Sequence, residues 1–285
     1  MSLNTMGPVA DVAAEAALAV SYGLDSVWAG QQPGGLDALS VLAAAGDGPR
    51  EVGTAVAQTY PVHPVARATA ALTVQELVGG RLTLGLGPSH AWIVTGQLGI
   101  PYTAPARHTR EYLEVLRPLL RGEHVKYSGE FFTVDAQLAV NVPAPPVLIS
   151  AMGPRMLQIA HDLADGTIAT WVRPATVADW LVPRLADGAR VVVGAMVAVT
   201  NDPDAVREAV ATNLSIVNDM PAYRAILDRG GLSGPADAII VGSESEVLAE
   251  LRRFRDAGTT DLLVAPFCPP EERGRVLEVA AQARS

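Results

Sequence analysis

The chain contains a single cysteine and a single lysine among its 285 residues. Because Lys126 is the only lysine, arginine supplies almost all of the positive charge. Cys268 alone cannot form a disulfide or a CxxC metal or redox motif within one chain, and no base lies near it in the sequence. We therefore interpret Cys268 as a structural residue rather than a catalytic thiol.

Long apolar runs and an excess of basic residues are also missing. No apolar run reaches the length of a membrane span, and the N-terminal MSLNTMGPVADVAAEA has no basic region before its apolar stretch. The net charge is −9 and the pI is about 5.0. An acidic surface disfavours nucleic acids and anionic membranes as general partners, because both attract basic proteins. We expect a cytoplasmic protein.

Several common cofactor and metal motifs are absent. GLGPSH has a G-x-G arrangement but lacks the third glycine of a dinucleotide-binding fingerprint, and Pro88 stands where the helix of that motif would begin. The sequence has no Walker A motif. The five histidines form no H-x-H or H-E-x-x-H pair, so we expect no metal site.

The sequence does have a repeated alternation of short apolar strands with longer amphipathic helices. The expected strands cover at most 2–6, then 24–30, 52–58, 81–87, 146–151, 167–172, 190–200 and 260–266. The expected helices cover 36–46, 63–80, 107–122, 154–166, 175–188, a long stretch from residue 204, and 243–258, where Ser243 and Glu246 form a capping box. About eight such units predict a single-domain (β/α)8 TIM barrel of the α/β class over residues 1–285. Residues 123–134 predict a hairpin inserted between the fourth and fifth strands.

Two strand ends share a design in which glycine is followed by proline. GRLTLGLGPSH has Gly85 and Gly87 where a strand could bury larger side chains, which suggests that another group approaches the backbone. In SAMGPRM, Gly153 allows close approach, Pro154 suits the first helical position, and Arg155 adds positive charge beside the free N–H groups. Side by side on a barrel, the two turns would form a pocket for a phosphate and an aromatic ring. The alternative for the second turn is that its Gly-Pro pair merely starts a helix and that Arg155 is a solvated surface side chain.

Polar and aromatic residues after other strands would face the same pocket. His90 is the candidate acid or base, since histidine titrates near neutrality. Further candidates for the pocket wall are Gln31, Gln32, Thr59, Tyr60, His63 and Trp171. Four of these candidates have an alternative structural interpretation: a hydrogen-bonded loop residue for His90, a helix-start residue before Pro64 for His63, and packing residues for Tyr60 and Trp171.

Longer segments resemble a known family. GTAVAQTYPVHPVARATAALTVQELVGGRLTLGLGPSH, SAMGPRMLQIAHDLADG and IIVGSESEVLAELRRFRDAGTTDLLV resemble the luciferase-like flavin and deazaflavin oxidoreductases. The resemblance spans nearly the whole chain. It is closest to the branch that uses coenzyme F420, which is related to the methylenetetrahydromethanopterin reductases. The resemblance implies a barrel with an insertion between strand 4 and strand 5.

The resemblance also implies where the cofactor binds. GTAV would form a bulge under the deazaflavin ring, with a cis peptide between Ala55 and Val56. The implied cofactor contacts are Thr54, Ala55 and Val56 at the bulge, Gly87, Pro88 and Ser89 on the next turn, and Ser150, Ala151, Met152, Gly153 and Pro154 near the phosphate. The pattern of the strand ends adds Arg155 and Trp171 to this set.

The function implied by the resemblance is hydride transfer between C5 of F420 and a small organic substrate. A proton would come from His90, or from a water held by Gln32 or Tyr60. F420-dependent sugar phosphate dehydrogenases have glutamate at the position of His90 and histidine at that of Gln32, so we do not expect sugar phosphate oxidation. The alternatives are an FMN-dependent luciferase-like monooxygenase and a non-catalytic F420-binding or carrier protein. Dimers are usual in this family, and we expect a homodimer.

Overall fold

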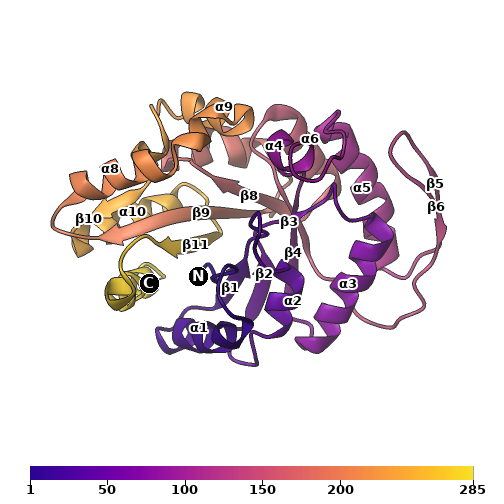
Figure 1. The fold of residues 1–285 in the computed structure, drawn as a ribbon, viewed down its shortest axis with the longest axis horizontal. Helices are drawn as coiled ribbons and strands as arrows, with labels where there is room; N and C mark the ends of the chain where they lie inside the picture. Colours follow the sequence, from indigo (N-terminus) through magenta and orange to yellow (C-terminus); the bar gives the residue numbers. More distant parts are fainter. Residues whose placement is uncertain (285) are drawn as a thin grey trace.

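The parallel strands of the computed structural model, which describes residues 1–284, form a ring in sequence order (Figure 1). Each strand is parallel to the next in the series β1 (Ser26–Ala29), β2 (Glu51–Thr54), β4 (Leu82–Gly87), β7 (Val147–Ser150), β8 (Gly166–Thr170), β9 (Arg190–Val199) and β11 (Asp261–Pro266). The N-terminal segment closes the ring: the Ser2 amide donates to the Val264 carbonyl (3.0 Å) and the Leu3 amide to the Trp28 carbonyl (2.8 Å). The chain is a (β/α)8 barrel, as the alternation predicts.

Helices surround the barrel, and one of them has at its start the cap that the sequence predicts. They are α1 (Val9–Ser21), α2 (Ala38–Ala43), α3 (Pro64–Leu77), α4 (Ala91–Val94), α5 (Pro105–Leu120), α6 (Pro154–Leu163), α7 (Pro174–Thr176), α8 (Pro203–Asn213), α9 (Pro221–Arg229), α10 (Glu244–Asp256) and α11 (Arg273–Gln282). Ser243 and Glu246 form the predicted capping box of α10. No helix within residues 1–284 is both long and apolar enough to cross a membrane.

Both faces of the strands are buried. The barrel interior holds a cluster contributed by Trp28, Leu148, Ile168, Val192 and Leu263. On β4, the side chains of Leu82, Leu84 and Leu86 instead belong to the larger core that the helices share. Burial on both faces explains why the strands are almost continuously apolar in sequence.

An ion-pair network around Arg190 joins the amino ends of three strands. Its guanidinium donates to both carboxylate oxygens of Glu51 on β2 (2.7 and 3.1 Å) and to both of Asp261 on β11 (3.1 and 2.7 Å). Although burial opposes the charge, these hydrogen bonds raise the pKa of Arg190 above its usual range. The network ties β2, β9 and β11 together at the end of the barrel opposite the turns singled out above.

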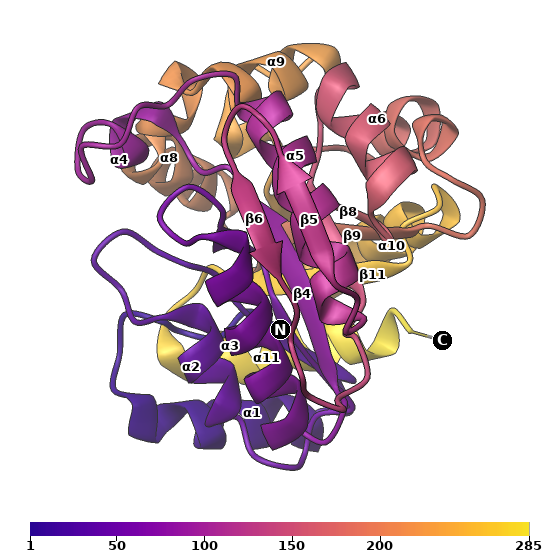
Figure 2. The ribbon, with the colours of Figure 1, turned by 90° about the vertical axis from the view of Figure 1, so that its right-hand side faces the viewer.

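The predicted insertion is confirmed as a hairpin of β5 (Val125–Ser128) and β6 (Thr133–Ala136). Figure 2 shows this hairpin lying along α5, outside the barrel. The buried Glu111 of α5 holds the turn, because its carboxylate accepts from the backbone amides of Glu130 (3.0 Å) and Phe131 (2.8 Å).

Three expected elements near the barrel openings differ in the structure. The first strand is reduced to an isolated bridge at Ser2. The strand expected over 52–58 is split by a bulge into β2 and β3 (Ala57–Gln58). The helix expected over 175–188 is α7 followed by a π turn and then a 3-10 turn that ends at Arg184. Pro183 explains the last change, because it has no N–H to continue an α-helix.

Other differences concern helix length and one additional strand. The helix expected over 36–46 is limited to α2, which Asp37 caps by accepting from the Ser40 amide (2.9 Å). The stretch from residue 204 divides into α8 and α9 around a 3-10 turn over Ser215–Asp219. An unpredicted strand, β10 (Ile240–Gly242), pairs with the last residues of β9.

Candidate active site

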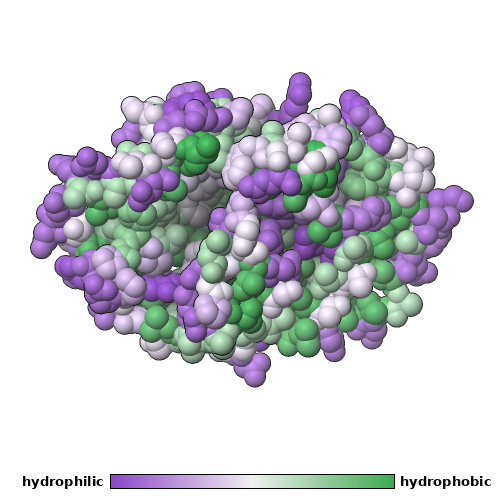
Figure 3. Space-filling model, in the orientation of Figure 1, coloured by the Kyte–Doolittle hydropathy of each residue, from purple (hydrophilic) through white to green (hydrophobic). Residues whose placement is uncertain are grey.

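A cavity of about 580 Å³ opens at the carboxyl ends of β4 and β7, where the active sites of (β/α)8 barrels lie. Helices α4 and α9 contribute to its walls, and the surface is hollowed next to α9 (Figure 3). Most of the lining is apolar and includes Met152, Met156 and Met220. A volume of about 300–1,000 Å³ is typical of small-molecule sites, so the cavity can hold a ligand of cofactor size.

A bulge between β2 and β3 forms the first wall. The Ala55–Val56 peptide is cis, as the resemblance implied, and Val56 lines the cavity. Ala55 does not line it and packs with Val56 against the interior cluster of the barrel. Thr54 is fully buried, and its hydroxyl donates to the Gly85 carbonyl (2.6 Å) and accepts from the Gly85 amide (2.8 Å). The bulge is therefore anchored to the neighbouring strand.

The same bulge explains the two glycines of β4. A Cβ at Gly85 would lie 1.9 Å from the Thr54 carbonyl oxygen, so the group that approaches this backbone is the bulge and not a ligand. At Gly87 a Cβ would lie 2.7 Å from Cγ2 of Val56 and 3.3 Å from Cβ of Ser150. The absent side chain at Gly87 gives Val56 room beside the cavity that Gly87 itself also lines.

The turn after β7 forms the opposite wall. Ser150, Met152, Gly153 and Pro154 line the cavity, while Ala151 is fully buried behind them. Gly153 is the N-cap of α6 and has open space on the side where a Cβ would point. This helix terminus, with Pro154 at its first position, has free backbone N–H groups that favour an anion. Arg155 is exposed and lies outside the cavity lining.

His90 lines the cavity beside two tyrosines. Its ring meets the ring of Tyr223 edge-on, with centroids 4.9 Å apart. Burial lowers the pKa of His90 and raises the pKa of Tyr223. The hydroxyl of Tyr102 donates to the Ser89 carbonyl (3.0 Å), and burial raises the pKa of Tyr102 to about 12. Within residues 1–284 the Tyr223 hydroxyl makes no hydrogen bond.

None of the six residues expected in the pocket wall lines the cavity. Gln31 donates to the Leu36 carbonyl (3.3 Å) and accepts from the Ala38 amide (3.0 Å), and Thr59 is buried. His63 is the N-cap of α3, where its Nδ1 accepts from the Val65 amide (3.3 Å), which favours its structural alternative.

Gln32 is exposed in the loop after β1. The hydroxyl of Tyr60 donates to the Thr103 carbonyl (2.6 Å), and its ring stacks on His108 with centroids 3.8 Å apart. Trp171 has a φ of 59° and lies behind Tyr223, with ring centroids 6.1 Å apart. These positions favour the structural alternative for Tyr60 and Trp171.

The sequence analysis missed the wall that follows β8 and β9. Trp180, Met220, Tyr223, Ile226 and Arg229 all line the cavity. Trp180 follows α7 in the segment that was expected to be a regular helix, and the others come from the stretch that was expected to be one long helix. The one available signal was the Met-Pro pair before Ala222, where Pro221 begins a new helix.

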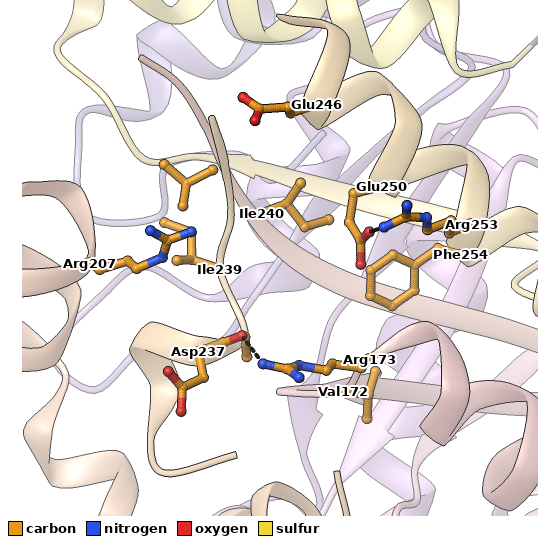
Figure 4. Close-up of a pocket in the computed structure, with 12 residues that line it drawn as sticks. Val172, Arg173, Arg207, Asp237, Ile239, Ile240, Glu246, Glu250, Arg253 and Phe254 are labelled. Carbon is orange, nitrogen blue, oxygen red and sulfur yellow. Dashed lines mark hydrogen bonds and ion pairs between the residues drawn. The ribbon is translucent and has the colours of Figure 1, made fainter. Parts of the chain in front are cut away.

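A second hollow, of about 320 Å³, lies between α8, β10 and α10 (Figure 4). It is lined by equal numbers of opposite charges, namely Arg173, Arg207, Arg253, Asp237, Glu246 and Glu250. Arg253 pairs with Glu250 at 2.9 Å. Because its charges balance and it is remote from the Gly-Pro turns, we place the candidate active site in the larger cavity. Within residues 1–284 no group of three or more acidic, histidine or cysteine side chains could hold a metal ion.

The barrel and its cavity define a (β/α)8 barrel with a ligand site at the carboxyl ends of the strands, the architecture of a barrel enzyme. The sequence profile of the family described as luciferase-like monooxygenase matches residues 1–261. The chain belongs to this family of enzymes.

Curated relatives include two 5,10-methylenetetrahydromethanopterin reductases. The one from Methanolobus tindarius is 29% identical over 250 residues, covering 83% of this chain and 76% of the relative. The one from Archaeoglobus fulgidus is 35% identical over 125 residues, and the match covers 44% of this chain but only 37% of the relative. Among solved structures, the coenzyme F420 dependent tetrahydromethanopterin reductase from Methanopyrus kandleri has a TM-score of 0.82 at 19% identity, covering 99% of this chain and 96% of that one. This last similarity supports the fold.

Proposed function

We propose that the chain is an F420-dependent oxidoreductase that transfers hydride between C5 of the deazaflavin and a small organic substrate. One observation carries the proposal: Val56 at the bulge, the turn after β4 and the turn after β7 all line one cavity. These are the segments at which the resemblance places the cofactor. The named activity of the M. tindarius relative supports a reductase, and the M. kandleri enzyme, which has the same fold, is named as F420-dependent.

The residues present fit such a cofactor. Val56, Pro88 and Met152 offer an apolar surface to a planar ring. Gly153 lines the cavity and has open space where a Cβ would point, and the N-terminus of α6 beside it favours a phosphate. Thus one part of the cavity suits the ring and another part suits the anion.

The chain's own residues would bind, orient and shield the reactants, while bound F420 would supply the hydride chemistry. The wall formed by Met220, Tyr223 and Ile226 would keep water away from the ring. Reduction of a C=C, C=N or C=O group also needs a proton, which a group on the cavity wall must hold.

His90 and Tyr223 are the groups that we propose to handle this proton. The lowered pKa of His90 makes its imidazole neutral near pH 7, and the raised pKa of Tyr223 keeps its hydroxyl protonated. The hydroxyls of Tyr60 and Tyr102 already donate to backbone carbonyls. Because Gln32 and Tyr60 lie outside the cavity lining, we no longer assign the proton to a water that they hold.

The experiment is a titration of the purified protein with F420 and with FMN, followed by assays of cofactor reoxidation and oxygen consumption. We expect F420 to bind at least tenfold more tightly than FMN, and reduced F420 to be reoxidised by an activated acceptor without oxygen. A preference for FMN with oxygen consumption would instead indicate a monooxygenase. Tight F420 binding without turnover of a broad set of acceptors would indicate a carrier. Light scattering would test the homodimer, which stays a prediction.

A further inference from the structure

Trp180 lies between two arginines at the edge of the cavity. The guanidinium carbon of Arg229 is 3.3 Å from the centroid of the Trp180 ring, and that of Arg184 is 3.6 Å from it. Two guanidinium groups at such distances cannot share one face of a ring, so they occupy opposite faces. Of the two, Arg229 lines the cavity. The arrangement is a three-layer stack with one cation directed toward the ligand space.

The stack is tied to the turn after β7. The indole Nε1 of Trp180 donates to the Met152 carbonyl (2.8 Å), and Nη1 of Arg184 donates to the Trp180 carbonyl (3.0 Å). Met152 directly precedes Gly153, the N-cap of α6. The position of Arg229 is therefore set by the same turn to which we assign the phosphate.

Neither arginine of the stack has a carboxylate partner within residues 1–284. This is notable because the chain has a net charge of −9 and pairs most of its other arginines with acidic side chains. The one carboxylate in the cavity lining, Asp219, makes no ion pair with Arg229. A guanidinium stacked flat on an indole keeps the N–H groups at its edge free, and these match two oxygens of a phosphate.

We propose that Arg229, positioned by Trp180 and Arg184, binds the phosphate group of the cofactor and discriminates phosphorylated from phosphate-free forms of the chromophore. The proposal rests on the proposed function, because it takes the ligand of this cavity to be F420. Arg229 would touch the cofactor directly, whereas Trp180 and Arg184 act through Arg229 as positioning residues.

The test compares binding of F420 with binding of its phosphate-free deazariboflavin chromophore. For Arg229→Gln we expect F420 affinity to fall tenfold or more, affinity for the phosphate-free chromophore to change less than twofold, and the salt dependence of F420 binding to weaken. Arg173→Gln is the matched control, because Arg173 also lacks a carboxylate partner within residues 1–284 but lies in the second hollow. This control should leave both affinities unchanged.

A second variant separates the contact from its support. Trp180→Leu should lower F420 affinity, though less than Arg229→Gln does. Trp180→Phe keeps an aromatic face and should retain most of the parent's F420 affinity. Thermal unfolding of each variant shows whether the fold is intact.

The outcomes distinguish the two proposals. If the parent binds F420 and Arg229→Gln binds it equally well, or if the variant loses both ligands equally, the role of Arg229 is wrong while the proposed function stands. If the parent binds FMN instead of F420, the proposed function is wrong, and the pair of FMN and riboflavin tests the same phosphate contact. If the parent binds none of these ligands, both proposals are wrong.

Discussion

Gly153 offers the sharpest test of where the phosphate binds, because a Cβ added there meets no protein atom. A Cβ at Gly153 would have no heavy atom within 4 Å, and its φ of −89° is one that any residue adopts. Loss of a flexible glycine stabilises by about 0.4–1 kcal/mol, and loss of a good N-cap costs a similar amount. We therefore expect Gly153→Val to change the free energy of unfolding by less than about 1 kcal/mol.

Binding should respond very differently. If the phosphate lies against this turn, the valine side chain occupies its space, and F420 affinity should fall at least tenfold, which is about 1.4 kcal/mol. Calorimetric titration measures the affinity and thermal unfolding without ligand measures the stability. A Gly153→Val variant that is folded and binds F420 as tightly as the parent would refute the location of the phosphate.

Gly85→Ala is the matched contrast, because its side chain would meet protein instead of ligand space. The added Cβ would lie 1.9 Å from the Thr54 carbonyl oxygen and 2.5 Å from Cδ1 of Ile168. Overpacking costs about 1–3 kcal/mol, and displacing the bulge would also disturb the hydrogen bonds of the Thr54 hydroxyl. We expect Tm to fall by about 6–12 °C for a loss of about 3 kcal/mol. An unchanged Tm would show that the bulge is not fixed as described.

Three further predictions concern stability and proton transfer. Burial, partly opposed by Glu111, holds the pKa of His108 at about 4. As pH falls below about 6.5, the histidine is therefore protonated in the unfolded chain before it is protonated in the folded one. Between pH 6.5 and 4 the free energy of unfolding of the parent should fall by on the order of 3 kcal/mol relative to that of His108→Phe. Urea unfolding at several pH values measures this, and a pH-independent difference would contradict it. Arg190→Met should lower the free energy of unfolding by about 3 kcal/mol, because it leaves Glu51 and Asp261 unpaired. Adding Glu51→Gln and Asp261→Asn should recover part of the loss. An Arg190→Met variant as stable as the parent would count against a stabilising role of the network. His90→Ala should lower kcat more than F420 affinity once a substrate is found, because a proton-transfer group acts mainly in the transition state. Weakened F420 binding with unchanged turnover would assign His90 to binding instead.

The barrel and the inserted hairpin could be predicted because their signals are local. Buried parallel strands are apolar throughout, helices of the barrel are amphipathic, and Gly129 marks the turn of the hairpin. The broken helix after residue 175 could not be predicted from its apolar pattern. There the π turn keeps the apolar spacing nearly helical, while Pro183 removes an amide that the regular helix needs.

The glycines of β4 show how one sequence signal can have two physical causes. A glycine at a strand end reports that something lies close to the backbone, but it does not report what. At Gly85 the neighbour is the Thr54 carbonyl, a contact between residues 31 positions apart along the chain. At Gly153 the space is open instead. Only the fold separates the glycine that serves packing from the glycine that has open space at the cavity wall.

The wall that carries Arg229 depends on contacts that no local pattern encodes. β9 is ten residues long, whereas β7 has four, and the last residues of β9 pair with β10 beyond the ring that the other strands form. The chain that leaves β9 therefore begins farther out, and α9 returns from there to line the cavity. The position of Arg229 further requires Trp180, which lies 49 positions earlier (229 minus 180) and is held by the Met152 carbonyl. Thus the walls formed by the bulge and by the turns after β4 and β7 follow from adjacent strand ends that the sequence makes visible, whereas the wall that carries Arg229 depends on three segments that meet only in the folded barrel.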